Sequence, residues 1–209
     1  MQAVSSGVLD QLFNKARTHS HWQERSVAGE LLKQLYEAVR FGPTSANCFP
    51  MRLVFLQSRE SKERLKPALN PGNVEKTMQA PVTAIIAYDI RFYEYLPRLY
   101  PQTPAREWFS DNPEYAEETA FRNGSLQGGY FILAARALGL DCGPMSGFDN
   151  AFVDHEFFSE KSSAPTFLQE HCPDSHIKSN FLCNLGYGES SKLHPRNPRF
   201  EFDEVCRTL

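Results

Sequence analysis

Apolar residues recur at helical spacing in two places near the start of the chain. Over about 7–16, four of them fall on one helical face and predict a first helix: Leu9, Leu12, Phe13 and Ala16. A second apolar stripe predicts a helix over 27–41, with Ser26 as its N-cap and Gly42 and Pro43 after its end. Two helices therefore precede the first predicted strand.

Short apolar runs predict three strands. Residues 52–57 form the first, and a charged helix over 60–69 follows it, opening after Ser58. Residues 81–89 are apolar at nearly every position, which is typical of a strand buried on both faces. A last strand is predicted over 180–185.

The longest predicted helix covers 113–138 and is rich in alanine and glycine. Each glycine inside a helix costs roughly 1 kcal/mol relative to alanine, so we expect close packing against another backbone to offset Gly124, Gly128 and Gly129. A short helix is predicted after Asp149. The segment 90–113 is aromatic, without a clear period, and we interpret it as a cover over a pocket.

The predicted helices and strands mix without the strict alternation of a doubly wound sheet. We therefore predict the α+β class, with a central sheet flanked by helices. No internal repeat and no long linker divides the chain, which predicts a single domain over 1–209.

Composition excludes several classes of function. A chain of 209 residues with 41% apolar and 22% charged residues is typical of a globular domain. A net charge of −3 gives no reason to expect a nucleic acid or a membrane surface as partner. The first ten residues have neither a basic nor a hydrophobic leader region, and the five cysteines have no paired spacing. We expect a cytoplasmic protein with reduced thiols.

Common catalytic motifs are absent from the sequence. There is no G-x-G-x-x-G after a predicted strand and no phosphate-binding P-loop. The serine in Gly143-Pro-Met-Ser-Gly147 is one place too late for a nucleophile elbow. No histidine pair has metal-ligand spacing, so we expect no catalytic metal.

Four polar segments remain as candidate binding sites. The segment 15–20 places Lys15, Arg17, Thr18, His19 and Ser20 together, which suits a phosphate; the alternative is an exposed helix end carrying basic residues. The segment 41–50 is dense in turn and hydrogen-bonding residues, which suits a polar shelf for a planar heterocycle or simply a capped turn. Segments 143–149 and 194–199 allow a similar choice between a ligand contact and ordinary loop or tail chemistry.

Taken together, these segments resemble the FMN-binding pattern of the nitroreductase family, in order and over nearly the whole chain. The resemblance is closest to the branch that contains malonic semialdehyde reductase. It is carried by Pro43-Thr-Ser-Ala-Asn-Cys48, by residues 117–128 and by residues 140–150.

The resemblance implies a nitroreductase-like fold with a central mixed sheet, completed by an intertwined homodimer that holds FMN at the subunit interface. Arg17 and Arg196 would bind the phosphate, beside Thr18 and His19. The ribityl chain and ring would be contacted by a further set of residues: Pro43, Thr44, Ser45, Asn47, Asn73, Ser146 and Gly147. No residue is assigned as a catalytic acid or base, because FMN carries the hydride.

The implied activity is that of an NAD(P)H-dependent flavin oxidoreductase that reduces 3-oxopropanoate to 3-hydroxypropanoate by ping-pong hydride transfer. Two alternatives are a broad nitroreductase or quinone reductase and a flavin-binding protein without turnover. For an anionic substrate we expect a cation in the cover, from Arg91, Arg98 or Arg106; each could instead face solvent. The stretch 155–178 looks longer than in relatives and is interpreted as a surface insertion.

Overall fold

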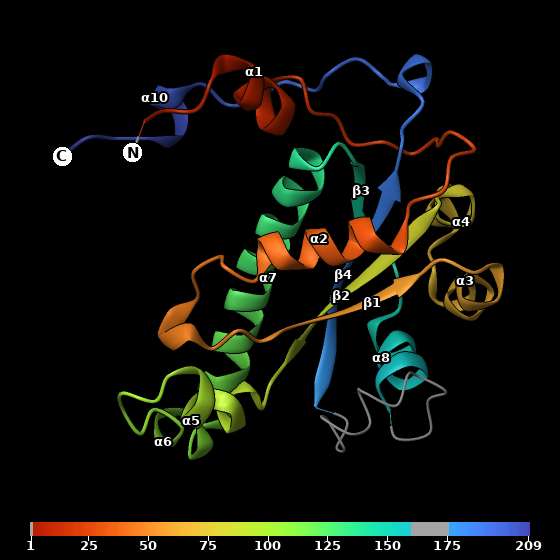
Figure 1. Ribbon diagram of the computed structural model, residues 1–209. Coiled ribbons are helices and arrows are strands. Elements are labelled where there is room, and N and C mark those ends of the chain that lie inside the picture. Colours follow the sequence, from red (N-terminus) through yellow and green to blue (C-terminus); the bar gives the residue numbers. More distant parts are fainter. Residues whose placement is uncertain (1, 160–175) are drawn as a thin grey trace.

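The computed structural model describes residues 2–159 and 176–209 (Figure 1). Most of the insertion expected over 155–178 lies outside these residues. The described part contains a four-stranded sheet in the order β1-β2-β4-β3. Its strands are β1 (Met51–Leu56), β2 (Val82–Asp89), β3 (Asp141–Met145) and β4 (Ile177–Gly186).

All three neighbouring strand pairs are antiparallel. The expected α+β class is confirmed, but the sheet is antiparallel where a mixed sheet was expected. The parallel pairing found in the described chain is a single bridge between Thr18 and Cys142. Every residue of β2 is buried, as its continuous apolar run predicted.

Helices cover both faces of the sheet (Figure 1). On one face, α2 (Gly29–Val39) and α7 (Pro113–Ala137) share a core cluster with the strands. On the other face lie α3 (Arg59–Leu65), α4 (Pro71–Gln79) and α8 (Asn150–Phe158). The result is three layers around one central strand pair.

The remaining helices are short. Near the ends of the chain lie α1 (Ser6–Leu9), which continues as a π-helical turn over Asp10–Asn14, and α10 (Phe202–Val205). The predicted cover contains a 3₁₀ turn over Phe92–Tyr95, then α5 (Leu96–Leu99) and α6 (Glu107–Ser110). Three further 3₁₀ turns complete the described part: Ser45–Asn47, Lys66–Ala68 and Ser190–Lys192.

Two predicted helix starts are confirmed and one is wrong. The side chains of Ser58 and Asp149 accept backbone N–H bonds and cap α3 and α8. Ser26 does not cap α2, which begins at Gly29 after Ala28. Val27 is buried instead, so this part of the chain serves the core before the helix starts.

The sequence patterns missed β3 and α4. Gly143 and Pro144 favour a loop, yet both lie in β3, which is an edge strand. An edge strand tolerates proline because one row of its backbone groups needs no sheet partner. Asn70, Pro71 and Gly72 also favour a turn, although Pro71 occupies the first turn of α4, where its missing N–H costs nothing.

Across 2–159 and 176–209, no helix has the length and apolarity to cross a membrane. Cys48, Cys142, Cys183 and Cys206 are free thiols, and the fifth cysteine lies outside the described ranges.

The three glycines of α7, which were expected to pack closely against another backbone, differ in their surroundings. A Cβ atom on Gly124 would lie 2.8 Å from Tyr88 Cβ, and one on Gly128 would lie 2.5 Å from the Phe181 ring. Both glycines therefore let α7 approach its own sheet. A Cβ on Gly129 would meet nothing within 4 Å.

This contrast predicts opposite effects of alanine at two sites on one helix. Gly124→Ala should lower the free energy of unfolding by about 1–3 kcal/mol, because the new methyl group overpacks against Tyr88. Gly129→Ala should raise it by about 0.5–1 kcal/mol through helix propensity alone. Urea denaturation of both variants checks this, and a change of the same sign in both would contradict it.

Candidate functional site

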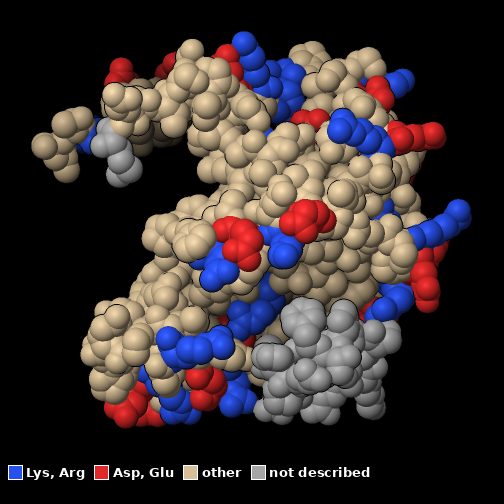
Figure 2. Space-filling view, in the orientation of Figure 1, with Lys and Arg blue, Asp and Glu red and all other residues tan. Residues whose placement is uncertain are grey.

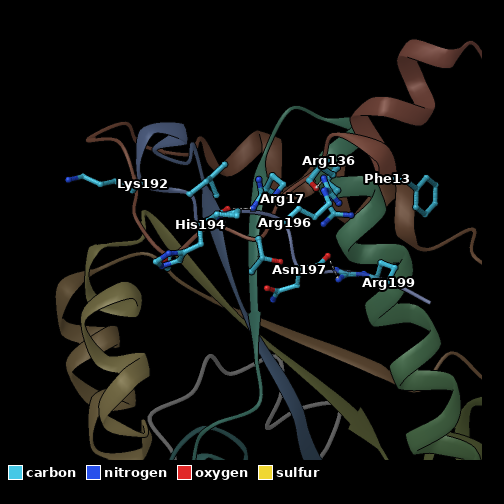
Figure 3. Close-up of a pocket in the computed structure, with 13 residues that line it drawn as sticks. Phe13, Arg17, Arg136, Lys192, His194, Arg196, Asn197 and Arg199 are labelled. Atoms are coloured by element: carbon cyan, nitrogen blue, oxygen red, sulfur yellow. Dashed lines mark hydrogen bonds between the residues drawn. The ribbon is translucent and has the colours of Figure 1, made fainter. Parts of the chain in front are cut away.

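A cavity of about 590 Å³ opens where the two ends of the chain cross near the C-terminal end of α7 (Figure 3). The segment that follows the π-helical turn forms one wall, and the segment 192–199 forms another. The lining residues are Phe13, Ala16, Arg17, Thr18, Ser20, Arg136, Lys192, Leu193, His194, Pro195, Arg196, Asn197 and Arg199.

The charge in this cavity has one sign. Among the described residues that line it, none is acidic and five are cationic: Arg17, Arg136, Lys192, Arg196 and Arg199. Arg17, Arg136 and Arg196 converge in the middle, with Lys192 and Arg199 on opposite sides (Figure 3). Forked guanidinium donors without neighbouring carboxylates favour a phosphate or another oxyanion.

Reciprocal hydrogen bonds hold the two walls together. Arg17 donates from Nη2 to the His194 carbonyl at 2.5 Å. In return, Arg196 donates to the carbonyls of Asn14 at 2.8 Å and Ala16 at 3.0 Å. Because carbonyl oxygens carry only partial charge, these contacts orient the two guanidinium groups without neutralising them.

Arg136, in the last turn of α7, also lines this cavity. Its Nη1 donates to the Leu12 carbonyl at 2.8 Å, while its buried Nε finds no hydrogen-bond partner in the described part of the chain. A basic residue in the last turn of a helix also interacts favourably with the helix dipole. The sequence patterns missed Arg136, because that ordinary position gave no sign of a ligand.

The segment 15–20, which was predicted to suit a phosphate, contacts the sheet at β3. Thr18 forms a parallel bridge with Cys142, and the His19 N–H donates to the Cys142 carbonyl at 3.0 Å. A Cβ on Gly143 would lie 2.5 Å from the His19 carbonyl, so a glycine is needed for this close approach.

His19 itself does not line the cavity. The His19 side chain is buried, and its Nε2 lies 3.5 Å from an Asp141 carboxylate oxygen. A Cβ on Gly188 would collide with the His19 ring. The polar cluster 15–20 therefore supplies Arg17, Thr18 and Ser20 to the cavity, while His19 packs inside.

A second group of predicted residues meets beyond the other end of β3. Asn73 Nδ2 donates to the Gly147 carbonyl at 2.7 Å, and the Asn70 N–H donates to the same oxygen at 3.1 Å. A Cβ on Gly147 would lie 2.7 Å from Asn73 Nδ2. The structure thus brings Asn73 of α4 against Gly147, next to the exposed Ser146.

Strand β3 joins these two groups. Cys142, beside Thr18, is five residues before Gly147, and five residues of chain span at most about 18 Å. One elongated ligand along β3 could reach from the cationic cavity to the Asn73–Gly147 contact.

The third group, Pro43, Thr44, Ser45 and Asn47, lies elsewhere. The Ser45 N–H donates to Asn123 Oδ1 at 2.9 Å, and Asn123 precedes Arg136 by thirteen residues of continuous helix, about 20 Å. Figure 1 also places this loop well away from the chain ends. A single chain does not bring this group to the cationic cavity.

The third group is conformationally unusual. Ala46, Asn47 and Phe49 have φ angles of 49°, 51° and 43°. Left-handed backbone at three non-glycine residues so close together is rare and costs of order 1–3 kcal/mol at each. Such strain persists only where the surroundings enforce it, and it is concentrated at functional sites.

The three arginines expected to face a substrate differ in their surroundings. Arg106 binds Glu94 through two bonds of 2.8 and 2.9 Å, and Arg91 Nη2 also approaches Glu94. The hydrogen bond from Arg106 is the main reason why the pKa of Glu94 is lowered. Arg98 is exposed, with its guanidinium 5.9 Å from the centre of the Tyr95 ring. Arg98 is thus the best placed of the three for an anion from solution.

Within the described ranges, no three His, Cys, Asp or Glu side chains come together in a way that could hold a metal ion.

The fold and cavity define an α+β protein with a cationic site between its chain ends. Residues 14–161 match the model of the nitroreductase family, so the chain belongs to the nitroreductase family. The predicted family and the α+β, nitroreductase-like fold are therefore confirmed.

Solved structures agree over the full length. A Bacillus subtilis protein assigned as a nitroreductase is 19% identical, with a TM-score of 0.79 and coverage of 98% of this chain and 100% of that one. An Exiguobacterium sibiricum protein with the same assignment, in complex with FMN, is 15% identical, with a TM-score of 0.79 and full coverage of both chains. A Staphylococcus epidermidis protein assigned as an NAD(P)H:FMN oxidoreductase is 18% identical, with a TM-score of 0.76 and coverage of 100% and 98%.

Proposed function

We propose that this protein is an FMN-dependent NAD(P)H oxidoreductase. The observation that carries the proposal is the cationic cavity, whose described lining contains five Lys and Arg residues and no acidic residue. Family membership and the FMN in the Exiguobacterium relative support the same cofactor. The Staphylococcus relative supports NAD(P)H as the electron donor.

The residues present fit FMN along β3. Arg17 and Arg196 would hold the phosphate with Thr18 beside them, and Arg136 adds a cation from α7. Asn73 and Gly147 would lie beside the ring, beyond the far end of β3. When bound, FMN supplies a hydride relay between NAD(P)H and an acceptor, which makes ping-pong kinetics the expectation.

This proposal predicts a clean difference between FMN and riboflavin, which lacks the phosphate. Arg17→Ala or Arg196→Ala should weaken FMN binding by about 1.5–3 kcal/mol, the scale of a hydrogen bond to a charged group, and leave riboflavin binding almost unchanged. Fluorescence titration of both ligands measures the effect.

The purified wild-type protein should also be yellow and lose its colour quickly when NAD(P)H is added without oxygen. Failure to bind FMN at micromolar concentration would overturn the flavin proposal. Stable yellow colour in the presence of NAD(P)H would instead favour a flavin-binding protein without turnover.

We further propose a homodimer, in which the loop 43–47 of one chain completes the site of the other. The distance of this loop from the cationic cavity of its own chain supports this arrangement. Large apolar side chains lie exposed on α7 and near the C-terminus: Phe121, Leu126, Phe200, Phe202 and Val205. Figure 2 shows a broad notch beneath the terminal segments, with few charges on its visible walls. An interface between two copies would cover such surfaces.

The dimer can be tested with one charge placed on α7. Leu126→Arg should produce a monomer with severely weakened FMN binding, because a charge would be buried at the interface. Phe152→Arg is the matched control, since Phe152 is also exposed but lies on α8 at the opposite face of the sheet. Sedimentation of both variants decides, and a wild-type monomer that still binds FMN would contradict the proposal.

For the acceptor we propose a small aldehyde acid, 3-oxopropanoate, on the strength of the residue match described above. Its carboxylate would need a cation, and Arg98 is the exposed candidate in the cover. One observation favours the broader alternative of a nitro or quinone reductase. Glu94 already engages Arg91 and Arg106, which leaves the cover less cationic than the sequence suggests.

Arg98→Ala should lower kcat/KM for 3-oxopropanoate by roughly 10-fold or more while sparing a neutral nitroaromatic and a quinone, because only the acid loses an ionic contact. Arg106→Ala is the control and should show no such selectivity. Equal turnover of all three acceptors by both variants would support the broad reductase.

A further inference from the structure

One arginine binds the backbone at the C-terminal end of the strained loop 43–50. Arg52 Nη1 lies 3.2, 3.3 and 3.0 Å from the carbonyl oxygens of Phe49, Pro50 and Met51. Three consecutive carbonyls can point at one donor only if the backbone turns tightly, and Phe49 has the left-handed φ that such a turn requires.

The arginine is itself fixed by a buried carboxylate. Arg52 Nη2 lies 2.6 Å from Asp89 Oδ2, and Asp89 is fully buried at the end of β2. The Arg91 N–H donates to the other carboxylate oxygen at 2.8 Å, and His176 Nε2 lies 3.4 Å from it. A buried carboxylate needs such partners, so it keeps the guanidinium in place.

The same arginine reaches the cover. Its guanidinium lies 5.3 Å from the centre of the Tyr95 ring. The loop is joined to the cover a second time, because Asn47 Nδ2 donates to the Leu99 carbonyl at 2.7 Å. Cys48 is buried in the same apolar cluster as Phe92 and Leu96. Loop and cover therefore form one packed unit around Arg52.

We infer that Arg52, fixed by Asp89, is a positioning residue that holds the loop 43–47 in the conformation needed to contact the flavin ring. This inference rests on the proposed function and adds residues that the family resemblance did not single out. Arg52 acts on the ring end of the site through the loop, whereas Arg17 and Arg196 act on the phosphate end directly.

Arg52→Lys separates the two tasks of this side chain. Lysine keeps a cation for Asp89 but lacks the forked donors that reach the carboxylate and the carbonyls together. Arg64→Lys is a matched control, because Arg64 also pairs with a carboxylate (Glu156, 2.6 Å), a backbone carbonyl and an aromatic ring, but on α3. Asp89→Asn tests the same pair from the other side.

The first measurement needs no flavin. Cys48 is 1% exposed and lies inside the loop, and burial raises the pKa of its thiol to about 11, so it should react slowly with maleimide. In flavin-free Arg52→Lys, Cys48 should be labelled about tenfold faster or more, read by peptide mass spectrometry, because losing charged hydrogen bonds opens the loop. Cys183, buried in β4, should remain protected. Unchanged labelling of Cys48, or equal acceleration at both thiols, would overturn the inference.

The second measurement is binding of FMN and riboflavin. Arg52→Lys and Asp89→Asn should weaken both ligands about tenfold and leave their affinity ratio unchanged, since the ring end is affected. Arg64→Lys should change neither by more than about twofold. If the Arg52 variant bound both ligands as tightly as the wild type, or lost affinity for FMN but not for riboflavin, the inference would be overturned and the proposed function would stand. A wild-type protein that binds no FMN would overturn the proposed function with it.

Discussion

The arrangement at one end of the sheet depends on the ion pair between Arg52 and the fully buried carboxylate of Asp89. A charge without contact to water must be compensated, and the partners come from three parts of the chain: Arg52 of β1, the N–H of Arg91 and His176 before β4. The Asp89 N–H also donates to the Pro50 carbonyl at 2.9 Å. The compensation of one charge thus brings together a loop, two strands and the start of the cover.

At the other end of the sheet, electrostatics works in the opposite way. There the arginines are oriented by backbone carbonyls and have no carboxylate among the lining residues of the cavity. Their positive charge has no carboxylate partner among the lining residues, whereas Arg52 forms an ion pair with Asp89. Arginine therefore supports the structure at one end of α7, and in the function we propose it binds a ligand at the other; the difference is the presence of an acid.

Helix α7 sets the spacing between these two regions. Asn123 holds the loop 43–47 and Arg136 lines the cavity, so the helix keeps them about 20 Å apart. Gly124 and Gly128 let the helix lie close against its own sheet. A rigid separation of this kind is the physical reason why we place one flavin between two chains.

Local sequence signals predicted several elements of the fold, and ordered motifs predicted the family. The continuous apolar run of β2, the long helix α7 and the caps Ser58 and Asp149 were all predicted, because each depends on neighbouring residues. Several ordered motifs together also identified the family, which no single motif could do.

Which polar residues lie together depends on contacts between segments that are distant in sequence. The Gly143–Pro144 segment forms a strand because it lies at the edge of the sheet. His19 is buried by packing, and Arg136 lines the cavity. Glu94 engaged two of the three arginines expected to face a substrate. These outcomes depend on residues distant in sequence, and the free energy of burying or pairing a charge is set by such neighbours, which no local pattern contains.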